Sequence, residues 1–211
     1  MIQKLKPVYV LALIAAIISC LIIVVYNLTY VDTSNILTDK QAAAVTAIYG
    51  GAKDDYEVVP AEEWQPVLEN SGNADLSKVT KLIRKKSDGS LAFECVVKGY
   101  KNGFDIMVGV DGGTVAGVAI VSVGEETPGL GTNTNKPEFL DNFKGITDKA
   151  TIVKTTPSNA GEVQAVTSAT FSSRGVANAV NIALAAEAVI NDSKIDYIMN
   201  AFESRNGGEA Q

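Results

Sequence analysis

The chain has 211 residues, 46% of them hydrophobic, with a formal net charge of −6, no histidine and two cysteines, Cys20 and Cys95. This length allows one globular domain of ordinary size plus a small additional element, and the acidic balance argues against a nucleic-acid-binding protein, which would carry a basic patch. The lack of histidine excludes Ser-His-Asp and Cys-His catalysis and histidine-based zinc, non-haem iron and haem sites, and two cysteines are too few for an iron–sulfur cluster, so redox chemistry would need an organic cofactor.

An uncharged apolar run occupies residues 8–26. As a helix it would span about 28 Å, close to the hydrocarbon thickness of a bilayer. Lys4 and Lys6 precede the run and acidic residues follow it, so the positive-inside rule predicts a cytoplasmic N-terminus and an extracytoplasmic remainder. A cleaved signal peptide and a lipoprotein lipidated at Cys20 are the alternatives, but the run is long and continues past Cys20 without a polar tether. We therefore predict that residues 1–31 hold a cytoplasmic stub and a single helix crossing the cell (inner) membrane.

A helical pattern follows at residues 35–49, where Thr38 and Gln41 are spaced for a capping box and two glycines end the pattern. Residues 53–73 are charged and contain two prolines, which indicates an irregular surface with short elements. We interpret residues 32–90 as a linker helix and a peripheral segment.

Three β-strands are predicted next, at residues 93–98, 104–111 and 114–123. Asn102-Gly103 and Asp111-Gly112-Gly113 are hairpin signals between them. The pattern predicts a three-stranded antiparallel meander with one face packed on a C-terminal helix, which is an α+β fold. Cys95 alternates with apolar residues and is predicted to be a small core residue.

The C-terminal half completes the predicted domain. A short helix at residues 136–143 places Phe139, Leu140 and Phe143 on one side, and the longest amphipathic pattern of the soluble part begins at Arg174. The remaining predictions are short strands at 151–153 and 163–166, a half-buried turn at 195–202, a domain core spanning 91–200 and a C-terminal tail at 201–211.

Two stretches of small residues are candidates for a binding site. Residues 126–131, Glu-Thr-Pro-Gly-Leu-Gly, follow the third strand and predict a tight loop with exposed backbone N–H groups. The stretch lacks the Gly-Lys-Ser/Thr ending of a P-loop and is not a GxGxxG fingerprint.

The second stretch, residues 164–174, precedes the C-terminal helix. Ser172 and Ser173 are candidate N-caps, so Thr170 is predicted to lie a few residues upstream of a helix N-terminus. Free backbone N–H groups and the helix dipole favour an anion there. A hydroxyl on such a turn could carry a phosphate, although an ordinary capped turn has the same pattern.

Together the two stretches resemble the motifs of one flavoprotein family. Residues 167–170, Thr-Ser-Ala-Thr, followed by Ser-Ser-Arg, resemble the flavinylation motif of the Rnf complex G subunit and of its relative, the C subunit of the sodium-pumping NADH:quinone reductase. Residues 126–131 resemble the family's second hallmark, which lines the flavin pocket. The resemblance implies an FMN esterified to Thr170 by a flavin transferase that uses FAD as donor. One position departs from the motif, because the family usually has Asp where this chain has Gln164.

The resemblance also implies a function. The chain would be an electron-carrier subunit of an Rnf-type ion-translocating ferredoxin:NAD+ oxidoreductase complex. The subunit would be held on the outer side of the membrane and would have no catalytic constellation of its own. Its implied partners are the other membrane and peripheral subunits, the flavin transferase and the lipid bilayer, with no nucleic acid. The implied fold is one FMN-binding domain with an antiparallel sheet packed against helices. The expected cofactor-binding residues are Thr170, Ser168, Ala169, Thr127, Gly129, Leu130, Gly131 and Thr132.

Other interpretations stay open at this point. The chain could be the C subunit of a quinone reductase or a stand-alone extracytoplasmic flavoprotein, or a non-redox binding module in which Thr170 is unmodified. Arg174 could neutralise a flavin phosphate or be a solvated surface residue.

Overall fold

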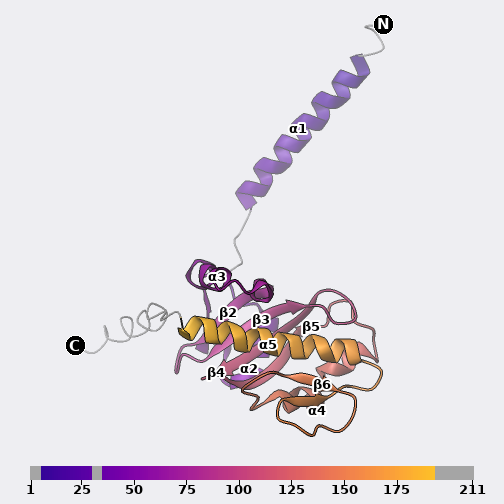
Figure 1. The fold of residues 1–211 in the computed structure, drawn as a ribbon. Coiled ribbons are helices and arrows are strands. Elements are labelled where there is room, and N and C mark those ends of the chain that lie inside the picture. The colour runs from indigo at the N-terminus through magenta and orange to yellow at the C-terminus, as the bar shows by residue number, and fades with distance from the viewer. Residues whose placement is uncertain (1–5, 30–34, 193–211) are drawn as a thin grey trace, which may run out of the picture. The chain divides into compact units, whose positions relative to one another are not determined.

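The computed structural model describes residues 6–29 and 35–192 (Figure 1). The predicted stub at 1–5, the turn at 195–202 and the tail at 201–211 lie outside the described residues. The chain divides into two units, Met1–Thr33 and Ser34–Gln211. In the first unit, helix α1 spans Lys6–Thr29, and its portion Tyr9–Thr29 has a mean hydropathy of 2.8. The predicted helix is therefore present, and it is long and apolar enough to cross a membrane.

The second unit is built on a five-stranded antiparallel sheet in the order β1-β2-β3-β4-β5. Each strand pairs with its neighbour in sequence, so the sheet is a meander. The helices and strands of this unit are α2 (Asp39–Tyr49), β1 (Tyr56–Val59), α3 (Ala61–Asn70), β2 (Val79–Lys85), β3 (Leu91–Val97), β4 (Phe104–Asp111), β5 (Thr114–Ser122), α4 (Pro137–Leu140), β6 (Thr151–Val153), β7 (Glu162–Gln164) and α5 (Thr170–Asp192).

The predicted sheet has too few strands, because β1 and β2 add to the three that the sequence indicated. β1 has only four residues, and β2 reads Val-Thr-Lys-Leu-Ile-Arg-Lys, whose three cations conceal its alternation. The structure places one of these cations, Arg84, directly opposite Glu57 of β1 and pairs the two side chains. The segment predicted to be irregular surface therefore contains an edge strand and helix α3.

Helices cover both faces of the sheet. Helix α5 lies across one face and contacts β3 and β4, as Figure 1 shows, and α2 contacts β4 and β5. Strand alternation sends Phe104, Ile106 and Val108 into the core under α5, and Met107 into a second core with α2. The expected packing of the sheet against the C-terminal helix is confirmed, and so is the α+β fold class. Cys95 is fully buried, as predicted.

The capping box of α2 is confirmed. Thr38 Oγ1 accepts a hydrogen bond from the Gln41 N–H at 3.3 Å, and Gln41 Oε1 accepts one from the Thr38 N–H at 3.0 Å. The helix begins at Asp39, four residues after the predicted start, because Thr38 supplies the cap. Gln41 also donates to both carboxylate oxygens of the buried Glu94 on β3, at 2.9 and 2.8 Å, so the cap is joined to the sheet.

We expect Thr38→Ala to lower the free energy of unfolding of residues 34–211 by about 1 kcal/mol, because the first turn of α2 loses its side-chain acceptor. Urea titration would measure the change. Thr38→Ser keeps the hydroxyl and should unfold like the wild type. Equal stability of the alanine and serine variants would show that the cap contributes nothing.

The segment between the sheet and α5 is held by aromatic packing. Phe139, Leu140 and Phe143, which the pattern at 136–143 places on one side, are all buried, and the Phe139 and Phe143 rings meet edge to face at 5.3 Å. Strands β6 and β7 are three residues long each and pair in parallel. β7 ends at Gln164, six residues before α5 begins.

Candidate functional site

Helix α5 begins at Thr170, so the prediction of a start at Arg174 was wrong. Ser172 and Ser173 are not caps but lie in the first turn, where both are buried. Their hydroxyls are engaged elsewhere: Ser173 Oγ donates to the Ala169 carbonyl at 2.9 Å and accepts the Val166 N–H at 3.0 Å. The Ser173 N–H also donates to the Ala169 carbonyl at 2.9 Å, so Ala169, the residue before the helix, accepts its first backbone hydrogen bond.

Ser168 turns the chain immediately before this start. Its φ of 62° is the single positive value of a non-glycine residue in the described chain. Such a conformation costs free energy for a residue with a side chain and recurs at functional sites. The turn brings Thr170 to the first position of the helix.

The hydroxyl of Thr170 and the backbone N–H groups of the first turn of α5 are available to a ligand. Within the described chain, no hydrogen bond is found for its hydroxyl, and its N–H and those of Phe171 and Ser172 have no acceptor. Unpaired N–H groups at the first turn of a long helix favour negative charge. The arrangement therefore suits a phosphate attached to, or lying beside, the Thr170 hydroxyl.

The loop at 126–131 is closed by its own hydrogen bonds. The N–H groups of Leu130 and Thr132 donate to the Thr127 carbonyl at 3.2 and 3.3 Å. The Gly129 N–H donates to Thr132 Oγ1 at 2.9 Å, and Gly129 has a φ of 75° that favours glycine. Gly129 and Thr132 thus shape the loop.

The loop and the start of α5 enclose one pocket of about 500 Å³. Six of the eight expected cofactor-binding residues line it: Thr127, Leu130, Gly131, Ser168, Ala169 and Thr170. Gly129 and Thr132 are not part of the lining. The structure thus brings two segments that are far apart in the sequence to one cavity.

Sequence reasoning missed the aromatic edge of this pocket. Tyr100, from the β3–β4 connection, and Phe171 line it while being 58% and 61% exposed. Their ring centroids lie 6.4 Å apart at an interplanar angle of 57°. Leu130 is 45% exposed beside them. Exposed apolar groups gathered at a cavity mark a ligand site, and these would cover a flat aromatic ring system.

Glu126 was also missed, although it begins the loop motif. It is buried at the pocket wall, where Oε2 accepts a hydrogen bond from Ser172 Oγ at 2.6 Å and Oε1 accepts one from the Lys101 N–H at 3.0 Å. Its neighbour Glu125 is exposed. The sequence places Glu126 and not Glu125 in the loop motif, but no local pattern gives the burial of Glu126 or its hydrogen-bond partners.

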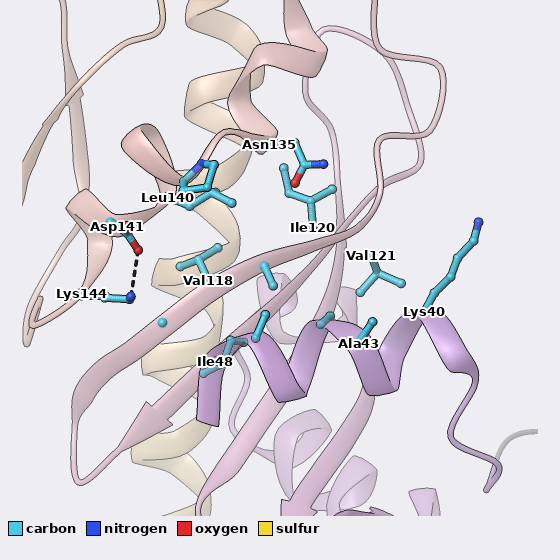
Figure 2. A pocket seen from close by; sticks show the side chains of 15 residues that line it. Lys40, Ala43, Ile48, Val118, Ile120, Val121, Asn135, Leu140, Asp141 and Lys144 are labelled. Atoms are coloured by element: carbon cyan, nitrogen blue, oxygen red, sulfur yellow. Dashed lines mark ion pairs between the residues drawn. The ribbon is translucent and has the colours of Figure 1, made fainter. Parts of the chain in front are cut away.

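A second groove of about 500 Å³ lies between α2, β5 and α4, and Figure 2 shows its lining. Ala43, Ile48 and Val118 form apolar walls, and the Asp141–Lys144 ion pair of 2.8 Å stands at its rim. It contains none of the expected site residues, and we assign it no function. No cluster of three or more histidine, cysteine or acidic side chains that could hold a metal occurs among the described residues.

One family model matches part of the chain. Residues 99–185 match the FMN-binding domain family, and this range includes both segments of the pocket, so the resemblance inferred from the two motifs is confirmed.

Two relatives carry more particular names. The chain is 28% identical over 138 residues to the G subunit of the Na(+)-translocating ferredoxin:NAD(+) oxidoreductase complex of Acetobacterium woodii, an alignment covering 62% of this chain and 66% of that protein. It is 39% identical over 88 residues to the G subunit of the proton-translocating ferredoxin:NAD(+) oxidoreductase complex of Clostridium ljungdahlii, covering 41% and 47%. Each match thus spans less than two thirds of the relative's own length.

Two solved structures of quinone reductase C subunits are also similar to this chain. Shewanella oneidensis NqrC is 21% identical, with a TM-score of 0.44 over 63% of this chain and 67% of that one. The C subunit of the Na(+)-translocating NADH-quinone reductase from Parabacteroides distasonis is 20% identical, with a TM-score of 0.47 over 74% and 93%.

Proposed function

We propose that this chain is the membrane-anchored electron-carrier subunit of an Rnf-type ion-translocating ferredoxin:NAD+ oxidoreductase complex, and that it carries FMN esterified to Thr170. The observation that carries the proposal is the unpaired Thr170 hydroxyl at the first residue of α5, opening into the pocket formed by the second family motif. The match to the FMN-binding domain family and the two G-subunit relatives support it.

The attachment step transfers FMN from FAD. The Thr170 hydroxyl oxygen bonds to the phosphorus of the FMN moiety, the P–O–P bond of FAD breaks, AMP leaves, and the hydroxyl proton is released. No electron is transferred, and a flavin transferase supplies the catalysis. This chain presents the hydroxyl, and the free N–H groups of the first turn of α5 stabilise the resulting phosphate charge. Arg174, exposed one turn further along α5, adds a cation beside it.

When bound, FMN accepts and donates one or two electrons. The task of the chain is then to hold and orient the flavin. Tyr100 and Phe171 would lie against the ring system, with Leu130 closing the side. An ester bond would also prevent FMN from dissociating on the outer side of the membrane.

The same proposal implies a topology. α1 would cross the cell membrane once with Lys4 and Lys6 in the cytoplasm, leaving the FMN-binding unit outside. The partners would be the other membrane and peripheral subunits of the complex, reached by electron transfer through the exposed edge of the pocket.

The test is the intact mass of residues 34–211 produced with and without a flavin transferase. We expect a gain of about 438 Da, one FMN minus water, only when the transferase is present. The Gln164→Asp variant restores the usual family residue at an exposed position and serves as the positive control. If neither the wild type nor Gln164→Asp gains this mass, the covalent-flavin proposal is wrong.

A further inference from the structure

We infer that Glu126 is the positioning residue of this site: its buried carboxylate holds the first turn of α5, and its negative charge lowers the reduction potential of a flavin bound in the pocket. The inference rests on the proposed function and assigns a role within that site.

The carboxylate connects three separate segments. It belongs to the loop at 126–131, its Oε1 accepts from the Lys101 N–H in the β3–β4 connection, and its Oε2 accepts from Ser172 Oγ in the first turn of α5. Ser172 lies two residues after Thr170. Since both partners act as donors to a side chain buried at the pocket wall, Glu126 fixes how the first turn of α5 faces the loop.

Glycines leave the space that this carboxylate fills. A Cβ added to Gly99 or to Gly131 would collide with the Glu126 carboxylate, and at Gly131 it would also lie 2.8 Å from Ser172 Oγ. Gly175 has the same restriction one turn along α5, where a Cβ would lie 3.1 Å from the Gly99 Cα. The backbones of Gly99 and Gly131 therefore approach the Glu126 carboxylate closely, and the backbone of Gly175 approaches that of Gly99.

The position of the charge has an electrostatic consequence. Reduction adds negative charge to a flavin, and a fixed negative charge at the wall of a partly desolvated pocket opposes that addition. Neutralising Glu126 should therefore make reduction easier and move the midpoint potential in the positive direction. A residue with a purely structural role would not produce this shift.

The chain offers a matched control, since Glu125 is adjacent, carries the same charge and is exposed. We would compare Glu126→Gln, Glu126→Ala, Ser172→Ala and Glu125→Gln in the full chain in detergent, each produced with a flavin transferase. Glu126→Gln keeps the shape and removes the charge. Its amide oxygen can accept the Lys101 N–H, and its NH2 group can donate to Ser172 Oγ, which then acts as the acceptor. Glu126→Ala removes both hydrogen bonds, and Ser172→Ala removes one of them and keeps the charge.

We expect Glu126→Gln to accept flavin and to show a midpoint potential more positive than that of the wild type, with Glu125→Gln at the wild-type value. Glu126→Ala and Ser172→Ala should be flavinylated about tenfold more slowly or worse, the size expected for losing a hydrogen bond to a buried charged group. Hydrogen exchange of the unmodified variants would separate local loosening at residues 99–101 and 170–173 from global unfolding.

Two results would overturn the inference alone. Equal potentials of Glu126→Gln and Glu125→Gln on a flavinylated protein would remove the electrostatic role, and wild-type flavinylation rates in folded Glu126→Ala and Ser172→Ala would remove the positioning role. A wild type that takes no flavin would instead reject the proposed function, and this inference with it.

Discussion

Thr170→Ala is expected to abolish covalent flavin attachment completely, leaving the intact mass unchanged after co-expression with a flavin transferase. The hydroxyl of Thr170 has no hydrogen-bond partner among the described residues, and it opens into the pocket that the loop at 126–131 encloses. Ser168 and Ser172 also line the pocket, but Ser172 Oγ is engaged by Glu126 and Ser168 precedes the first residue of the helix. Intact mass and in-gel flavin fluorescence would both report the loss.

Two control variants make this result specific. Thr170→Ser retains a hydroxyl at the first residue of α5 and should still gain about 438 Da. Thr156→Ala removes an exposed threonine from the β6–β7 connection, outside the pocket, and should be flavinylated like the wild type. A mass gain in Thr170→Ala would place the ester on another hydroxyl, and Ser168 would be the next residue to replace.

The prediction of a Thr170 site did not require the correct helix boundary. The sequence pattern indicated a helix starting at Arg174 with serine caps, whereas the structure starts it at Thr170. The difference arises because neither serine hydroxyl caps the helix. Ser172 Oγ donates to Glu126 of the loop, and Ser173 Oγ donates to the Ala169 carbonyl four residues earlier. Serines near a helix start are compatible with either arrangement, so local pattern could not decide between them.

The strands could be predicted where apolar and polar residues alternate. They could not be predicted where a buried ion pair takes the place of apolar residues. β3, β4 and β5 carry strong alternation with hairpin signals between them, and they lie where the pattern placed them. β2 carries Arg84, which only becomes compatible with its buried position once Glu57 of β1 lies opposite. That pairing joins residues 27 positions apart, which no local window contains.

The pocket likewise contains residues that the sequence predicted and residues that it did not. Residues that belong to the two family motifs were expected at the site, and most of them line one cavity. Tyr100 and Glu126 could not be singled out, because their roles depend on the approach of the β3–β4 connection to the first turn of α5. A backbone approach of this kind is set by packing between distant segments, for which Gly99, Gly131 and Gly175 give a signal only after the structure is known.

Asp105 gives the second large expected effect, and it concerns stability. Its side chain lies on the α2 side of β4, and its Oδ1 is buried without a hydrogen-bond partner among the described residues. Burial raises the pKa of Asp105 from 3.8 to about 7; the negative charge of Glu94 adds to this rise, and the positive charge of Lys81 opposes it. Because the pKa is higher in the folded state, the penalty is absent below the unfolded value, grows as pH rises above it, and is complete above pH 7.

We therefore expect Asp105→Asn to raise the free energy of unfolding of residues 34–211 by about 1–2 kcal/mol at about pH 8, a value reduced from the full pKa shift because the side chain is only part-buried and water screens it. At about pH 4 most of the gain should be lost, since the carboxyl of the wild type is then largely protonated in the folded protein and about half protonated in the unfolded one. Urea titrations at both pH values would measure this. Asp111→Asn removes the same charge from the exposed end of the same strand and should change stability little at either pH. An equal gain for Asp105→Asn at both pH values would mean that side-chain packing, rather than the ionised carboxylate, limits stability at this position.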